Sequence, residues 1–458
     1  MKPVFILFYT TVLICGLSSC TKSSFLDKKP NTSIIIPSSL PELRSLLDNT
    51  NVFTVSPGLG EVSADNYYLA FNDWQALSLL EHNTHNWAKD LFGTNRQVND
   101  WTIPYRQVLY ANIVLEKLWE IDPAAADLNE WKDLKGSALF LRALAFSNLV
   151  QHFAPAFDSS TATTDPGIPL RIVTNIHQLY PRASVKECYD LIFHDLSEAA
   201  ALLSVSLPAT ARNRPSRPAV YALVSRLCIS TRQYEKAGRY ADSCLSLYSK
   251  LIDYNTLSQS AATPFERSND ETIYYCQATT TLNVLLTTST TVFADTLLYR
   301  SYAANDLRRS IFFRTISSNN MGIKRGYSGT VFAYTGLATD EVYLNRAESF
   351  ARSGNMLAAM NDLNTLLSKR WKIGTYTALS AVSPADALNK ILTERRKELI
   401  WRGIRWSDLK RLNKEGASIT LSRLLDGQLY TLPPNSPLYV FPIPEDEISL
   451  SGITQNPR

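Results

Sequence analysis

Two segments of this chain follow the same helix–turn–helix plan, and that plan strongly constrains how the chain can fold. Residues 217–247 and residues 340–369 each read as two helices, with turns at residues 231–234 and 353–355. Each segment is about as long as a tetratricopeptide unit of ~34 residues. A single helix pair cannot bury its apolar faces, so we expect neighbouring helices to stack on it.

Small side chains mark the places where these helices can cross closely. Alanines recur at helical spacing in both segments: Ala222, Ala237 and Ala241 in one, Ala347, Ala351 and Ala359 in the other. A solenoid needs about three or more repeats, and only two copies are clear. A non-repetitive helical bundle is therefore the alternative to a repeat array.

Three further segments have helical periodicity. Residues 105–119, 131–152 and 185–203 carry apolar side chains at three- and four-residue spacing, which predicts an amphipathic helix in each. Ser184 stands at the N-cap position of the last one, and Glu187 follows three residues later. This pair is typical of a capping box, which satisfies the free N–H groups at a helix start.

The stretches between these helices are irregular. Residues 52–60 and 157–167 are rich in turn-forming residues, and residues 319–336 carry glycines among aromatic residues. Residues 272–293 have strand character, through threonine, valine and tyrosine. The predicted fold class is all-α dominated, with tetratricopeptide-like helical repeats, long irregular loops and a few short strands. Binding sites usually lie on such loops.

Composition excludes several classes of protein. The net charge is only +4, which argues against nucleic acid as a partner. Past Cys20 no apolar run reaches about 18 residues, so we expect no transmembrane helix. The later cysteines, Cys188, Cys228, Cys244 and Cys276, have no CxxC spacing, and the first three lie in apolar periodic segments. They read as small core residues and indicate neither a disulfide framework nor a metal site.

The N-terminus is built like an export signal. Lys2 supplies a positive start, residues 4–17 are apolar, and residues 17–20 read Leu-Ser-Ser-Cys. This arrangement resembles a bacterial lipobox, in which the signal is cut before the cysteine and the thiol is lipidated. We expect a signal peptide over residues 1–19, and a lipid anchor on Cys20 with an extension to residue 40. The alternative is an ordinary cleaved signal with a chance cysteine.

The C-terminal part carries a family resemblance. Residues 394–399 (Glu-Arg-Arg-Lys-Glu-Leu) and 403–411 (Gly-Ile-Arg-Trp-Ser-Asp-Leu-Lys-Arg) resemble the signature of SusD/RagB-type nutrient-binding lipoproteins. Other segments resemble the family in the same order: residues 25–27, 101–115, 138–145, 167–170, 341–348, 441–448 and 455–457. The chain departs from the family pattern at Trp401-Arg402 and at the terminal Arg458, and no acidic residue directly follows Cys20.

The resemblance implies a function. SusD-like proteins bind glycans and sit as a lid on a TonB-dependent SusC-like barrel in the outer membrane. For this chain, the resemblance implies a surface-exposed lipoprotein that binds oligosaccharide or another nutrient and passes it to such a transporter. It does not imply an enzyme. It also implies one body built from two halves, residues 41–260 and 261–458. The missing acidic residues after Cys20 weaken the inference of surface display, and no cofactor is expected.

Two other functions stay open. A tetratricopeptide adaptor would bind only protein. A hydrolase would need a catalytic motif, and HExxH, GxSxG and P-loop patterns are all missing. His82 and His85 could share a helix face, but a metal site needs a further ligand that the sequence does not reveal. Asp65, Asp73 and Asp90 lie among aromatic residues, yet no linear pattern reports the separation of carboxylates that a glycosidase needs.

The charges of the C-terminal signature predict local pairs. Arg395 and Glu398 are three residues apart, Glu398 and Arg402 four apart, and Arg405 and Asp408 three apart. A solvated charged face is one interpretation. The other is a set of ion pairs that lock this segment onto the repeats. Neither interpretation is catalytic.

A sugar site needs aromatic rings beside amides or carboxylates, because sugars present weakly apolar faces edged by hydroxyl groups. We expect Trp74, Trp87 and Tyr327 to stack on the ligand, and Asn72 and Asn95 to bond its hydroxyl groups. Tyr334 lies in the same glycine-rich segment as Tyr327 and joins the predicted ligand-binding set. The alternative is that both tryptophans are core residues, since tryptophan is highly buried on average.

Overall fold

The two predicted helix pairs are direct neighbours in the computed structural model, which describes residues 37–93 and 98–458. The first pair is α11 (Arg217–Ser230) and α12 (Tyr234–Leu247), and the second is α15 (Thr339–Arg352) and α16 (Met356–Ser368). Helix α12 packs on α15 although about ninety residues of loops and short strands separate them in the chain. The faces that one pair cannot bury alone are thus covered by the other pair.

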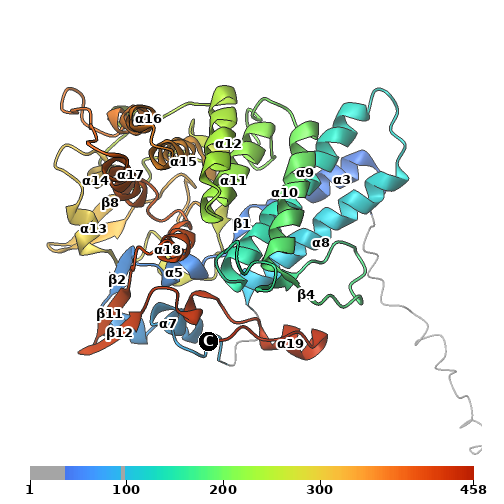
Figure 1. Ribbon diagram of the computed structural model, residues 1–458, viewed down its shortest axis with the longest axis horizontal. Coiled ribbons are helices and arrows are strands. Elements are labelled where there is room, and N and C mark those ends of the chain that lie inside the picture. Colours follow the sequence, from blue (N-terminus) through green and yellow to red (C-terminus); the bar gives the residue numbers. More distant parts are fainter. Residues whose placement is uncertain (1–36, 94–97) are drawn as a thin grey trace, which may run out of the picture. The chain divides into compact units, whose positions relative to one another are not determined.

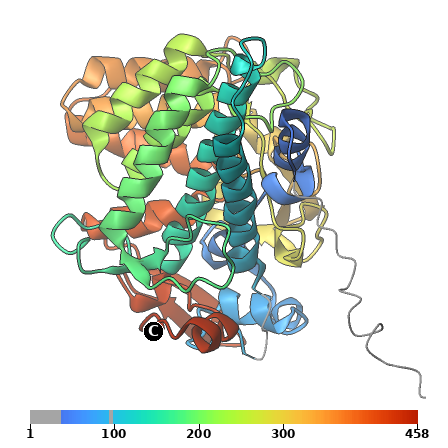
Figure 2. The ribbon, with the colours of Figure 1, turned by 90° about the vertical axis from the view of Figure 1, so that its right-hand side faces the viewer.

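The longer helices extend this array. Helix α8 (Asn99–Glu120) packs on α9 (Leu128–Phe153), α9 on α10 (Val185–Leu202), and α10 on α11, while α17 (Pro384–Glu398) packs on α15 and α16. Figure 1 shows the array above the short strands, and Figure 2 shows α8 and α9 side by side in teal. Each helix contacts its neighbour in the array, as the repeat prediction expects.

Shorter elements complete residues 39–458. The remaining helices are α3 (Leu40–Leu47), α4 (Thr50–Phe53), α5 (Leu59–Ser63), α6 (Phe71–Gln75), α7 (Leu79–His85), α13 (Thr296–Arg300), α14 (Arg308–Ile311), α18 (Arg405–Lys414) and α19 (Glu445–Ser451). Single 3₁₀ turns are η1 (Tyr254–Thr256), η2 (Asn283–Leu285) and η3 (Pro437–Tyr439). The strands are β1 (Val55–Ser56), β2 (Tyr67–Leu69), β3 (Pro166–Pro169), β4 (Arg182–Ser184), β5 (Thr272–Tyr274), β6 (Gln277–Ala278), β7 (Val292–Ala294), β8 (Phe313–Ser317), β9 (Asn320–Ile323), β10 (Leu337–Ala338), β11 (Leu421–Leu425) and β12 (Gln428–Leu432).

The strands of the described residues form only two-stranded pairs. β1 pairs with β6 in parallel, and the antiparallel pairs are β2–β7, β3–β4, β5–β10, β8–β9 and β11–β12. The prediction of a few short strands among long loops is confirmed. Residues 272–293 form strand at β5, β6 and the first two residues of β7, and the rest of that segment is loop and η2.

Helix starts and crossings follow from local chemistry. The hydroxyl of Ser184 accepts the N–H of Glu187, whose carboxylate accepts the N–H of Ser184, so the predicted capping box is confirmed. The predicted crossing alanines are all buried. A further close crossing lies at a residue that the sequence analysis missed, Gly238 of α12, because a Cβ there would lie 2.2 Å from Oγ of Ser349.

The C-terminal signature makes long-range ion pairs, and the predicted local pairs are wrong. Arg395 donates to Asp408 at 2.8 Å, and Arg402 pairs with Asp340 at 2.7 Å. The Glu398 carboxylate accepts from two other arginines, Arg308 at 2.9 Å and Arg370 at 2.6 Å, all three side chains being fully buried. Buried charges require close partners, and the fold brings those from distant segments. The alternative, ion pairs that lock the segment onto the repeats, is confirmed.

One of these pairs reaches the N-terminal part of the chain. Arg405 donates two hydrogen bonds to Asp65, at 2.7 and 2.9 Å, so it does not pair with Asp408. Burial alone would raise the pKa of Asp65, but Arg405 and Arg396 together hold it well below its usual range. Gly403, between α17 and α18, has φ +70°, and its N–H donates to Glu61 at 3.0 Å. The signature thereby fixes α5 and the loop that leads to β2.

The expectation that the later cysteines are small core residues is met. The four cysteines named above are free and buried. Among the described residues, none of the helices has both the length and the apolar composition needed to cross a membrane. The expected signal peptide, Cys20 and most of the extension lie outside the described residues.

Candidate ligand-binding surface

Three short strands bring aromatic and amide side chains to one place at the surface. β2 pairs with β7, and β7 lies against β9. The ring of Tyr68 on β2 lies 5.4 Å from the ring of Phe293 on β7, between centroids. The Tyr68 hydroxyl donates to Oδ1 of Asn320 on β9 at 2.7 Å. A partly exposed ring therefore stands next to an amide.

A second group of rings follows directly in the chain, on α6 and α7. Trp74 stacks on His82, with centroids 3.8 Å apart and 20° between the planes. The ring centroid of Phe71 lies 5.8 Å from that of Trp74, and the ring centroid of Tyr430 of β12 lies 6.1 Å from it. The two groups together are called the aromatic strip: Tyr68, Phe71, Trp74, His82, Phe293 and Tyr430. Tyr68, Phe71, His82 and Tyr430 are partly exposed, and Trp74 is only 6% exposed.

Asn72 is the predicted ligand residue whose position fits best. It is exposed on α6, one residue after Phe71 and two before Trp74. Asn95 lies outside the described residues. Trp74 is a core residue, as the alternative interpretation held: its ring is 6% exposed, and its Nε1 donates to the carbonyl of His82 at 3.1 Å.

Trp87 is a core residue, as the alternative interpretation held. Its Nε1 donates to the carbonyl of Ser63 at 3.0 Å, and the Arg423 guanidinium lies 5.0 Å from its ring. The backbone at Trp87 has φ +57°. The ring is 4% exposed, so it presents little surface on which a sugar could stack.

The expectation that Tyr327 is exposed is wrong. Its ring is 2% exposed, and its hydroxyl donates to Glu271 at 2.6 Å and accepts from Tyr254 at 2.9 Å. Tyr334 is buried too, and its hydroxyl donates to the carbonyls of Tyr274 and Leu337. Buried carboxylates and carbonyls need hydrogen-bond donors. A tyrosine supplies a hydroxyl donor and also buries an apolar ring. The glycine-rich loop therefore turns its tyrosines inward.

Four residues that the sequence analysis did not name complete the strip: Tyr68, Phe71, Phe293 and Tyr430. Residues 67–69 alternate between buried and partly exposed, so Tyr67 packs inside while Tyr68 faces outward. Period-two alternation is the signal that could have identified Tyr68 as an outward-facing ring. Tyr430 lies 356 residues beyond Trp74 in the chain, and no local pattern could have placed it there.

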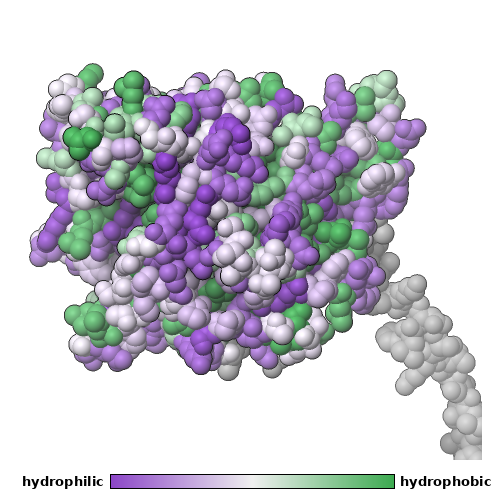
Figure 3. All heavy atoms as spheres, in the orientation of Figure 1, coloured by the Kyte–Doolittle hydropathy of each residue, from purple (hydrophilic) through white to green (hydrophobic). Residues whose placement is uncertain are grey.

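The β11–β12 hairpin also carries apolar surface, on the face opposite to Tyr430. Leu424 and Leu429 are cross-strand partners, 68% and 62% exposed. Figure 3 shows apolar side chains at its lower left, where Figure 1 places this hairpin. Such exposed apolar side chains favour contact with a ligand or a partner.

The titratable groups near the strip have structural roles. His85 is buried beside the Tyr67 hydroxyl, at 2.9 Å, and burial and the nearby Arg423 hold its pKa well below the usual value. Asp65 is held by Arg405 and Arg396. Among the described residues, no three side chains of histidine, cysteine, aspartate or glutamate are grouped as metal ligands would be.

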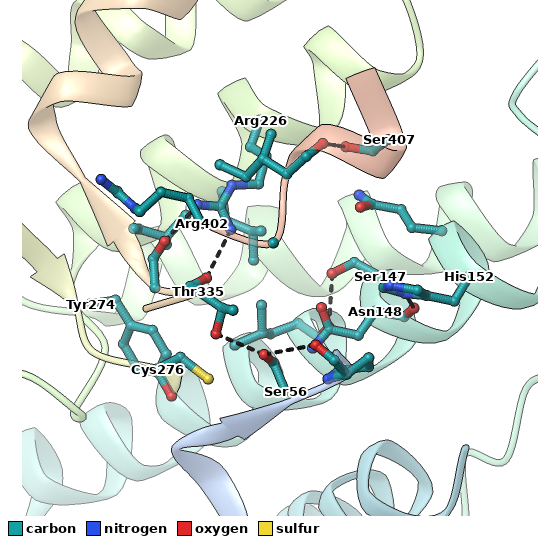
Figure 4. Close-up of a pocket in the computed structure, with 18 residues that line it drawn as sticks. Ser56, Ser147, Asn148, His152, Arg226, Tyr274, Cys276, Thr335, Arg402 and Ser407 are labelled. Carbon is teal, nitrogen blue, oxygen red and sulfur yellow. Dashed lines mark hydrogen bonds between the residues drawn. The ribbon is translucent and has the colours of Figure 1, made fainter. Parts of the chain in front are cut away.

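An interior cavity lies between the array and the C-terminal signature (Figure 4). It is lined by Ser56, Ser147, His152, Arg226 and Arg402, among others, and its volume is about 40 Å³. Ligand pockets for small organic molecules are ~300–1,000 Å³, whereas a water needs only ~10–15 Å³ of such volume. The cavity therefore fits a few waters and no sugar.

With the fold and surface described, comparison with known proteins places the chain in a family. Residues 24–229 match the family model described as "Starch-binding associating with outer membrane", and residues 339–458 match the model described as "SusD family". Both matches, with the helical array between short strands and long loops, define a SusD-like protein. The chain belongs to the SusD/RagB family.

Solved structures agree on the fold. A SusD superfamily protein from Bacteroides thetaiotaomicron is similar with a TM-score of 0.75 at 19% identity, covering 92% of this chain and all of the other. A putative sugar binding protein from Bacteroides vulgatus has a TM-score of 0.73 at 19% identity, covering 92% and 99% of the two chains. A SusD-like carbohydrate binding protein from the same species has 0.68 at 20%, covering 91% and 97%. No curated protein matches the chain.

Proposed function

We propose that this protein binds an oligosaccharide or another nutrient at the bacterial surface and delivers it to a TonB-dependent transporter of the SusC type. The observation that carries the proposal is the aromatic strip, with Asn72 and Asn320 beside it, in a chain whose N-terminal half matches a family described as starch-binding. Partly exposed rings supply the apolar faces on which sugars stack, and amides supply hydrogen bonds to hydroxyl groups.

A binding screen tests the ligand class. The mature protein, residues 20–458, is applied to an oligosaccharide array, and hits are followed by the release of new reducing ends. We expect binding without turnover, because Asp65, the carboxylate three residues before Tyr68, is held in ion pairs by Arg405 and Arg396. Binding of no glycan, together with capture of a protein partner through the helical array, would favour the tetratricopeptide adaptor instead.

The lipid anchor is part of the same proposal. One acyl chain holds a protein only marginally, whereas two or more hold it stably, so multiple acylation of Cys20 would suffice as an anchor. Cys20→Ala should release the protein from membranes or leave an uncleaved precursor. A normally processed variant that stays fully membrane-bound after a carbonate wash would contradict the proposal.

The helical array is the surface we propose for the transporter. It is regular and broad, and it lies apart from the aromatic strip in Figure 1. Mild solubilisation of outer membranes should recover the tagged protein with a large barrel protein. Recovery of the protein alone, in several mild detergents, would count against the docking proposal. It would not affect the glycan proposal, which the binding screen tests separately.

A further inference from the structure

A second surface feature, distinct from the aromatic strip, is rich in positive charge. A hollow of about 700 Å³ opens between α13, α14 and the β8–β9 hairpin, at the left of Figure 1. Four cations line it: Arg309, Arg314, Lys324 and Lys372. Among the described residues none of the four makes an ion pair with a carboxylate. The one acidic residue in the lining, Asp306, is buried and is held by Arg308 and Lys397.

Lys324 is the most constrained of these cations. Its Nζ donates to the carbonyl of Gln259 at 2.6 Å and to the carbonyl of Ser310 at 2.8 Å. An ammonium group has three N–H donors, so one donor remains without a protein acceptor among the described residues. The residue is 8% exposed, and burial lowers the pKa of its ammonium group. A buried cation without a counter-charge is unfavourable, and an anion in the hollow would relieve that cost.

Arg309 is also held in place. Its guanidinium lies over the ring of Tyr299, 5.0 Å from the centroid, and its Nε donates to the Tyr299 hydroxyl at 3.1 Å. Tyr299 packs edge-on against Phe313 at 5.2 Å, which fixes the ring. Arg314 is anchored by the carbonyls of Thr287 and Ser289. A cationic side chain that is already held in place loses less conformational entropy on binding an anion than a free one does. This favours a specific contact.

The hollow adjoins the aromatic strip across the β8–β9 hairpin. Asn320 of β9 bonds Tyr68 in the strip, whereas the next residue, Met321, and its partner Thr315 line the hollow. Because consecutive side chains of a strand point to opposite faces, a ligand that contacts both places must pass around the edge of the hairpin. The volume is within the range of pockets that hold small organic ligands.

We propose that the hollow binds the anionic groups, carboxylate or sulfate ester, of an acidic oligosaccharide whose neutral faces stack on the aromatic strip. The proposal rests on the proposed glycan-binding function and names its ligand class. Charge-assisted hydrogen bonds from arginine and lysine are about twice as strong as neutral ones, which would select acidic over neutral chains.

Three probes test the charge preference by titration calorimetry: oligogalacturonate, its neutral methyl ester, and a chondroitin sulfate oligosaccharide. We expect one acidic probe, carboxylate or sulfate, to bind at least about tenfold more tightly than the neutral ester. Unsulfated chondroitin, which keeps the glucuronate carboxylates and lacks the sulfate esters, is compared with chondroitin sulfate to identify the anion. Equal affinity for acidic and neutral probes would overturn the proposal.

Variants locate the effect. Arg309 and Lys372 are both at exposed positions. The double variant Arg309→Gln, Lys372→Gln should lower the affinity for the acidic probe about tenfold and leave the affinity for the neutral ester unchanged. Adding Lys324→Gln to the double variant should lower the affinity for the acidic probe further, with folding checked by circular dichroism. The matched control is Lys132→Gln, Lys186→Gln and Arg239→Gln, three exposed cations of the helical array.

The outcomes separate the two proposals. An equal loss in the control variant would show that only net charge matters and would overturn the assignment of the hollow. A second possible outcome is that neutral glycans bind, that Phe71→Ala weakens their binding, and that acidic probes bind no more tightly than neutral ones. The hollow proposal is then wrong, while the glycan function stands. If neither acidic nor neutral glycans bind at all, both proposals are wrong.

Discussion

Arg411 of α18 donates two hydrogen bonds to Glu348 of α15, at 2.6 and 2.9 Å, and both side chains are fully buried. Arg411 also bonds Asp408 at 2.8 Å, and Glu348 accepts a further bond from Arg352. The pair joins the C-terminal signature to the helical array. It therefore fixes the segment that in turn holds Asp65, next to the aromatic strip.

Removing the charge of Glu348 should destabilise the protein. Breaking a buried ion pair from one side costs ~3–5 kcal/mol, because an uncompensated charge is left inside. We expect Glu348→Gln to lower the free energy of unfolding by about that amount in urea denaturation. The matched control is Asp190→Asn, which breaks the exposed pair with Lys186 and should cost less than ~1 kcal/mol. Equal losses in the two variants would contradict the structural role of the buried pair.

Gly238 should tolerate no larger side chain. A Cβ at this position would lie 2.2 Å from Oγ and 2.7 Å from Cβ of Ser349, so α12 and α15 would have to move apart. Overpacking of this kind typically costs ~1–3 kcal/mol, and we expect a lower melting temperature for Gly238→Ala.

The pair Gly238 and Ser349 allows a second test. Ser349→Gly removes both atoms that a new Cβ would meet, so the double variant should lose less stability than the two single variants together. Strict additivity would show that the close approach of α12 and α15 is not the cause.

Asp100 should make stability fall with rising pH. Its Oδ2 accepts the N–H groups of Gly58 and Leu59, at 2.9 and 2.8 Å, deep in the core. Burial raises its pKa to about 7, and the two hydrogen bonds offset this only in part. Between about pH 4 and about pH 7 the unfolded chain has lost this proton while the folded protein keeps it, so the free energy of unfolding falls, by at most ~1.4 kcal/mol per pH unit.

Asp100→Asn removes this contribution and keeps an oxygen for both N–H groups. The difference in unfolding free energy between wild type and variant should therefore change across that pH range and level off above it. Urea denaturation at several pH values measures this difference. A difference that stays constant from acid to neutral pH would show that Asp100 keeps an ordinary pKa.

The sequence predicts the helical part of this fold well, because that information is local. Apolar spacing and the Ser184 capping box set the start of α10, and the alanines of α11, α12 and α15 mark real crossings. The ion pairs were predicted wrongly because the true partners are set by tertiary contacts and not by local spacing. Arg395 and Glu398 are close in the chain, but each has a stronger buried partner on a distant segment, Asp408 and Arg370.

The candidate site was predicted only in part, because exposure depends on tertiary packing. Asn72 is exposed beside the aromatic strip in the chain, whereas Trp74 is a buried ring within it, and Tyr327 and Tyr334 point into a core that needs their hydroxyl groups. Nothing in the local sequence distinguishes Tyr327, which is buried, from Tyr430, which reaches the strip from the β11–β12 hairpin.

The most direct test of the account is the affinity of a single-ring variant for the oligosaccharide that gives the strongest array signal. Phe71→Ala removes a partly exposed ring that lies 5.8 Å from Trp74, and Trp119→Ala removes an 85% exposed ring on α8 as the control. In titration calorimetry we expect Phe71→Ala to weaken binding about tenfold, or ~1.4 kcal/mol, in a protein that still unfolds cooperatively, with a lower melting temperature because the ring also packs on the core. Trp119→Ala should bind like wild type. Unchanged affinity in a stable Phe71→Ala protein, or an equal loss in Trp119→Ala, would contradict the assignment of the aromatic strip as the ligand site.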